Sequence, residues 1–114
     1  MDDTTTLSDL KNLVEGFVDQ RNWAQFHSPK NLSMALAVEA SELMDLFKWH
    51  TEIESVEAMK QASTKDAAVE EMADVVIYCV AFANRNGIDI AQAVTRKVSS
   101  NRRKYPARKF RGRF

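Results

Sequence analysis

The sequence is poor in the residues that form tight turns and covalent cross-links. Its 114 residues include three glycines, two prolines and one cysteine. Cys79 has no second cysteine to pair with, so an intramolecular disulfide is excluded and a reducing compartment, the cytoplasm, is expected. Because turn-forming residues are scarce, we expect few elements and long helices. Cys79 falls in the apolar run 75–83, where a buried hydrophobic role is expected rather than a nucleophilic one.

Long hydrophobic segments are also missing. No apolar run approaches the roughly 20 residues that a membrane-spanning helix needs. The acidic start Met1-Asp2-Asp3 does not resemble a signal peptide. The length predicts one domain with a small core. We assign residues 1–106 to this domain and residues 107–114 to a basic tail, which we expect to be disordered unless it meets an anion.

The net charge is zero, but its distribution along the chain is uneven. Residues 1–95 hold 16 acidic and 7 basic side chains, a charge of −9, whereas residues 96–114 hold 9 basic side chains and no acidic one, a charge of +9. A basic end beside an acidic body indicates either an anionic partner or charge complementarity between copies of the chain.

Apolar residues recur at helical spacing in four segments. These are about 8–22, 29–48, 65–86 and 90–104. Expected start and stop signals flank them: Ser8, Ser28-Pro29, Ser63-Thr64, Gly87 and Asp89. Residues 52–62 read as a short helix or a mobile connector. With no β alternation, repeat or glycine-rich phosphate loop, the sequence predicts an all-α fold, a four-helix bundle with short connections, in which Ala93, Val94 and Val98 face inward.

Two pairs of carboxylates interrupt the apolar stripes of the second and third predicted long helices. They are Glu39 with Glu42, and Glu71 with Asp74. Residues three apart lie on one helix face, so each pair shares a face with apolar residues. Partly buried carboxylates repel one another, and Mg²⁺, which takes oxygen ligands, offsets that charge. One such pair alone is usually a solvated face. Two pairs predict helices that face each other across a Mg²⁺ site.

Several longer motifs accompany the carboxylates. Together they resemble the all-α NTP pyrophosphohydrolase (MazG-like) superfamily, and within it the dCTP pyrophosphatase branch. The resemblance rests on Arg21-Asn22-Trp23-Ala24-Gln25-Phe26-His27, Pro29-Lys30-Asn31-Leu32, Glu39-Ala40-Ser41-Glu42-Leu43, Phe47-Lys48-Trp49, Glu70-Glu71-Met72-Ala73-Asp74-Val75-Val76-Ile77-Tyr78, and Lys97 followed by Asn101-Arg102-Arg103-Lys104-Tyr105-Pro106. It covers roughly residues 17–106, and the combination is more specific than the acidic motif alone.

This resemblance implies a Mg²⁺-dependent homo-oligomeric enzyme, a dimer or tetramer. Such an enzyme cleaves a nucleoside triphosphate, here dCTP, to the monophosphate and pyrophosphate. The resemblance implies that Glu39, Glu42, Glu71 and Asp74 hold magnesium. It also implies a substrate site formed by Trp23, His27, Trp49, Asp74, Tyr78, Lys97 and Asn101. Among the carboxylates we assign the activation of water to Glu42, with Glu39 beside it.

Each of these residues also has a structural interpretation. Without the resemblance, Trp23 and Trp49 read as core residues, and Lys97 with Asn101 as a solvated helix end favoured by the helix dipole. His27 is an alternative base, but a single loop histidine is more typical of a pocket wall. Tyr78, one turn after Asp74, either contacts the sugar of the substrate or only packs against other side chains. If its ring fills the space of a 2′-hydroxyl, the site would favour deoxyribose over ribose.

Other functions fit part of the sequence. A related pyrophosphohydrolase could act on dUTP or a damaged purine triphosphate, which the carboxylates do not distinguish. The basic stretch Lys97–Arg113 suits a helical nucleic-acid-binding module, although the acidic body beside it would repel a duplex. A non-catalytic helical adaptor is a third possibility, but it would have no use for carboxylates on apolar stripes.

Overall fold

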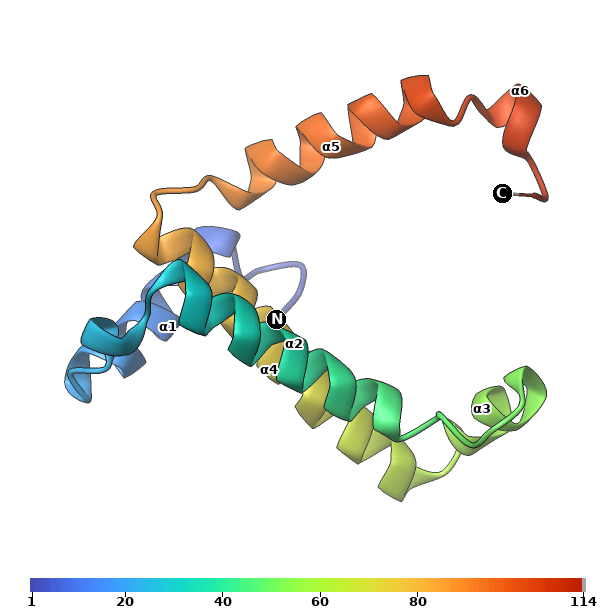
Figure 1. Ribbon diagram of the computed structural model, residues 1–114, viewed down its shortest axis with the longest axis horizontal. Helices are drawn as coiled ribbons and strands as arrows, with labels where there is room; N and C mark the ends of the chain where they lie inside the picture. The colour runs from blue at the N-terminus through green and yellow to red at the C-terminus, as the bar shows by residue number, and fades with distance from the viewer. Residues whose placement is uncertain (114) are drawn as a thin grey trace.

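The computed structural model describes residues 1–113, and in this range the chain is helical with no strand (Figure 1). The elements in chain order are α1 (Leu7–Gln20), the 3₁₀ helix η1 (Ala24–Phe26), α2 (Pro29–Asp45), α3 (Glu52–Ala58), α4 (Ala62–Arg85), α5 (Ile90–Lys104) and α6 (Ala107–Phe110). The all-α prediction is therefore confirmed. No helix within residues 1–113 combines the length and apolar character needed to cross a membrane.

The antiparallel pair of α2 and α4 forms the centre of the molecule (Figure 1). Helix α1 packs on the half of α4 that leads to its C-terminal end, where the Asn84 side chain donates to the Lys11 carbonyl at 3.0 Å and Lys11 Nζ donates to the Ile88 carbonyl at 2.8 Å. The buried core is small and comes from these three helices: Val18, Leu32, Ala68, Val80, Ala81 and Ala83.

Helix α5 extends away from the other helices (Figure 1). The inward orientation predicted for Ala93, Val94 and Val98 is wrong for the single chain, because residues 91–100 are all exposed, Val94 by 57% and Val98 by 44%. The reason is that, among the described residues, no helix packs closely against this face of α5. One chain thus packs α1, α2 and α4 together and leaves α5 outside, and α3 lies beyond the far end of the α2–α4 pair.

The helix ends explain where the predicted boundaries hold and where they shift. The Ser28 hydroxyl accepts from the Asn31 N–H at 3.1 Å before Pro29, and Asp89 accepts from the Gln92 N–H at 2.8 Å, as predicted. Helix α1 is capped by Thr6 rather than Ser8, because Thr6 and Asp9 form a reciprocal capping box. Helix α4 begins at Ala62 with Gln61 as its N-cap, which is earlier than the start near residue 65 predicted from Ser63-Thr64. Residues 52–62 include the short helix α3, as predicted.

Two further predictions are corrected. Cys79 is exposed, because α1 and α2 pack on α4 and, within residues 1–113, no other helix packs closely on the remaining face of α4. In the basic tail, Ala107–Phe110 forms a helical turn next to Tyr105, whose ring meets that of Phe110 edge to face at 5.3 Å. Residue 114 of the tail lies outside the described residues.

Candidate metal centre and adjoining pocket

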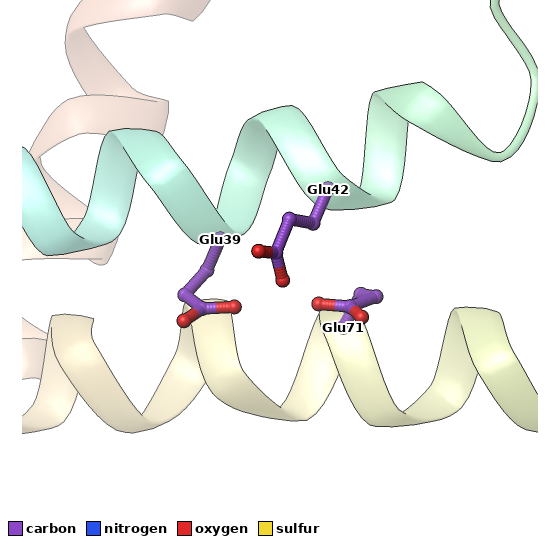
Figure 2. A group of neighbouring side chains, drawn as sticks. All are labelled: Glu39, Glu42 and Glu71. Carbon is purple, nitrogen blue, oxygen red and sulfur yellow. The ribbon is translucent and has the colours of Figure 1, made fainter.

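Three carboxylates converge between α2 and α4. Glu39 and Glu42 come from successive turns of α2 and Glu71 comes from α4. One carboxylate oxygen from each lies within 4.8 Å of the others, and Figure 2 shows the three groups pointing toward one another across the space between the helices. Glu39 and Glu71 are half-buried, and Glu42 is exposed. The facing helices predicted from the sequence are therefore present.

The electrostatics of this group favour uptake of a positive charge. Partial removal from water, followed by the proximity of Glu42, Glu39 and Asp74, raises the pKa of Glu71 to about 7. Removal from water and the neighbouring Glu42 and Asp74 also raise the pKa of Glu39. Within residues 1–113 no basic side chain forms an ion pair with these carboxylates.

A hard divalent cation fits this donor set. The Glu71 Oε2 atom is enclosed and has no hydrogen-bond partner among the described residues. An enclosed carboxylate oxygen without a partner is unfavourable, and coordination to a cation would satisfy it. Oxygen-only donors with crowded negative charge are the ligands that Mg²⁺ and Ca²⁺ use in proteins.

Asp74, the fourth predicted ligand, lies outside the group of three converging carboxylates. It lines an adjoining cavity instead, although its charge is close enough to contribute to the raised pKa values of Glu39 and Glu71. Asp74 therefore connects the two parts of the site.

The cavity lies between α1, the η1 segment and α4, and it has a volume of about 520 Å³. That volume is within the range of small-molecule pockets. Most of the lining is apolar, and the polar side chains of His27, Asp74 and Tyr78 interrupt it. The complete lining consists of Leu13, Val14, Phe17, Val18, Trp23, His27, Asp74, Ile77, Tyr78 and Ala81. Four residues predicted to form a substrate site, Trp23, His27, Asp74 and Tyr78, are thus brought together.

His27 carries an unused hydrogen-bonding atom in this wall. Its Nδ1 is enclosed and has no hydrogen-bond partner among the described residues. The segment that carries it is held by the Asn31 side chain, which donates to the Phe26 carbonyl at 2.9 Å, and by the His27 N–H, which donates to the Ala24 carbonyl at 3.1 Å. A bound molecule or water can supply the missing partner.

Three other predicted substrate residues do not line the cavity of the same chain. Trp49 follows α2, is 87% exposed and lies with its ring 5.5 Å from Lys48 Nζ. Lys97 and Asn101 share a face of α5, which extends away from the α2–α4 pair (Figure 1).

Sequence reasoning missed the α1 wall of the cavity. The helical apolar pattern of residues 8–22 assigns no site role to Leu13, Val14 or Phe17, yet these side chains line the cavity beside α4. No sequence signal separates a pocket wall from a core face, because both need the same apolar periodicity.

Comparison with known proteins agrees with the motifs. The model of the MazG-like family matches residues 34–113. The chain belongs to the MazG-like family. Proteins described as dCTP pyrophosphatase 1 are similar to it: the Rattus norvegicus protein is 41% identical over 107 residues, and the Homo sapiens protein 43% identical over 102 residues. These alignments cover 94% and 90% of this chain, but 63% and 60% of the two relatives.

The MazG-like fold is also supported by a solved structure. A pyrophosphatase from Archaeoglobus fulgidus superimposes with a TM-score of 0.81 at 35% identity, over 87% of this chain and 91% of that one. The family resemblance read from the sequence is therefore confirmed, and the all-helical arrangement is shared with a solved pyrophosphatase.

Proposed function

We propose that this protein is a Mg²⁺-dependent nucleotide pyrophosphohydrolase that converts dCTP to dCMP and pyrophosphate. The observation that carries the proposal is the convergence of Glu39, Glu42 and Glu71 beside a mostly apolar cavity large enough for a nucleoside. The similarity to proteins described as dCTP pyrophosphatase 1 supports dCTP as the substrate. Cytoplasmic location stays a prediction from the single cysteine.

Glu39, Glu42 and Glu71 would hold the cation, with Asp74 at the edge toward the cavity. Bound there, Mg²⁺ would supply charge neutralisation of the triphosphate and a lowered pKa for a coordinated water. Cleavage adds one water across the α–β anhydride, so a P–O bond forms, the bridging P–O bond breaks and a proton must leave the water. Glu42 would accept that proton, because it is the exposed member of the group. Glu39 lies one turn away on the same helix.

The cavity would hold the nucleoside. Trp23 offers a ring for base stacking, a contact typically worth about 1–3 kcal/mol per base. His27 and Tyr78 supply hydrogen-bonding groups, and Asp74 lies on the side toward the carboxylates. An apolar enclosure also excludes water from the bound base.

The predicted self-association would cover apolar surface that a single chain leaves exposed. Apolar side chains are exposed along α4 and α5, where a second copy would cover them and complete the four-helix bundle: Val69, Met72, Val76, Val94 and Val98. The −9 charge of residues 1–95 and the +9 charge of residues 96–114 favour contact between the acidic body of one copy and α5 of another. We therefore propose that Lys97 and Asn101, and Trp49 at the end of α2, act in the site of a neighbouring subunit.

A product assay tests this function. The protein is incubated with Mg²⁺ and a panel of dCTP, CTP, dUTP and purine triphosphates, and released pyrophosphate and orthophosphate are measured separately. We expect pyrophosphate, fastest from dCTP, and no release with EDTA. Glu71→Gln and Glu42→Gln should abolish turnover, whereas Glu70→Gln, an exposed neighbour on α4, should retain it. Release of orthophosphate would show that a different bond is cleaved, and a preference for dUTP or a purine would reassign the substrate.

A further inference from the structure

Arg21 joins two aromatic rings that line the cavity, although it is not among the lining residues itself. Its guanidinium carbon lies 3.7 Å from the centroid of the Phe17 ring and 5.9 Å from that of Trp23. Its Nη1 donates to the Phe17 carbonyl at 3.0 Å. The two rings meet edge to face, with centroids 5.7 Å apart.

The end of α1 brings Trp23 back to this position. The Trp23 N–H donates to the Val18 carbonyl at 3.1 Å and the Asn22 N–H donates to the Asp19 carbonyl at 3.0 Å, with Asn22 at a φ of +52°. This is the hydrogen-bond pattern of a Schellman motif, in which a residue in the left-handed region reverses the chain. The backbone therefore fixes where the Trp23 side chain begins.

The backbone does not fix how the ring is turned. Trp23 is 44% exposed and Phe17 is 48% exposed, so packing encloses only part of each ring. Arg21 adds a restraint on both rings, because its charge lies over the Phe17 ring and near that of Trp23 while its hydrogen bond holds it to α1.

We propose that Arg21 is a positioning residue that holds Phe17 and Trp23 as a rigid wall of the cavity. This inference rests on the proposed function in so far as the wall receives the nucleobase. A wall that is already ordered loses less conformational entropy when the base stacks on it, so substrate binds more tightly. The contacts of Arg21 are with Phe17 and Trp23 and not with the carboxylates, so the chemical step does not depend on it.

Steady-state kinetics with dCTP test this role in two variants. Arg21→Met, which keeps a long side chain without charge, should raise KM about three- to fivefold, the range that a cation–π contact supports, with kcat unchanged. Arg21→Lys, which keeps the charge, should fall between Arg21→Met and the unaltered protein. Arg85→Met, at an exposed arginine at the end of α4, is the matched control and should leave both constants unchanged.

A double-mutant cycle separates positioning from general stability. In a Trp23→Ala background, Arg21→Met should have no further effect on KM, because the ring that Arg21 positions is gone. An equal KM in Arg21→Met and the unaltered protein would overturn the inference. So would a fall in kcat, or the same rise in KM with Trp23 absent. Thermal melting of each variant identifies any that fail to fold.

An NMR measurement tests the positioning without relying on turnover. In ¹⁵N-labelled protein, the ¹⁵N relaxation of the Trp23 indole N–H should report a rigid ring in the unaltered protein and a more mobile one in Arg21→Met, with Arg21→Lys in between. Arg85→Met is the control, and it should leave the Trp23 ring as rigid as in the unaltered protein. If no nucleotide is hydrolysed, the proposed function fails while this measurement still decides the role of Arg21. Identical Trp23 mobility in all three proteins would overturn it.

Discussion

Glu39 on α2 and Glu71 on α4 bring carboxylate oxygens within 4.8 Å of each other across the main helix pair of the molecule. Each has a raised pKa, that of Glu71 reaching about 7. Negative charge is thus concentrated at the contact between α2 and α4 that organises the fold. Without a cation, repulsion at this contact opposes the packing of the two helices.

The stability of the metal-free protein should therefore fall as pH rises. The pKa of Glu71 is about 7 in the folded state against an ordinary value of 4.5, so the folded state binds more protons than the unfolded state within that window. The stabilising contribution is complete below pH 4.5 and is lost as pH rises through about 7. Glu39, whose pKa is raised in the same direction, adds to the effect.

Thermal melting in EDTA between pH 5 and pH 8 measures this dependence. Glu71→Gln, which carries no charge at any pH, should flatten the profile and melt higher than the unaltered protein at the alkaline end. Glu70→Gln is the matched control and should keep the original slope. A metal-free protein that becomes more stable across this range would show that the carboxylates do not repel one another in the folded state.

Trp23 should contribute to substrate binding more than to the chemical step. Removing a stacking ring worth about 1–3 kcal/mol predicts that Trp23→Ala raises KM for dCTP about 5- to 150-fold with a small effect on kcat. Phe26→Ala removes an exposed ring that does not line the cavity and should leave KM unchanged. Equal KM values for the two variants would mean that the base binds elsewhere.

Because we propose that residues of two copies form each site, two variants that are inactive alone should recover activity when they are mixed. Glu71→Gln lacks one carboxylate of the candidate metal centre, and Lys97→Ala lacks the α5 side chain that we propose acts in the site of the neighbouring subunit. In a mixed dimer, one of the two sites would combine intact carboxylates with an intact Lys97 from the other copy. Unfolding and refolding an equal mixture should then recover about a quarter of the normal activity, by random pairing of subunits in a symmetric dimer.

The control is each variant refolded alone, which should stay inactive. No recovery in the mixture, with mixed oligomers shown to form, would place Lys97 in the site of its own chain or outside the site.

The sequence predicts the long helices well because their signals are local. The Ser28 cap before Pro29, the Asp89 cap and Gly87, at a φ of +62°, act within a few residues of their own positions. It also predicts that Glu39, Glu42 and Glu71 converge, since each pair of acids shares a helix face and the two helices pack together.

What the sequence does not predict depends on packing between distant segments. The periodicity of Val94 and Val98 indicates an apolar face, but it does not say whether that face is covered by the same chain or by another. Leu13 and Phe17 line a cavity rather than a core because nothing else in the described chain fills the space beside α4. Asp74 shares the face of Glu71, yet a shift of one turn moves it from the carboxylate group to the cavity.

Calorimetric titration of the metal-free protein with Mg²⁺ at pH 7 tests the metal centre most directly. We expect saturable binding with release of protons, since the pKa of Glu71 is about 7 and a bound cation displaces its proton. Proton release is read by repeating the titration in buffers of different ionisation enthalpy. Glu39→Gln with Glu71→Gln should abolish binding, and Glu70→Gln should retain it. Binding that survives the double substitution, or no binding by the unaltered protein, would contradict the assignment of these carboxylates to a metal centre.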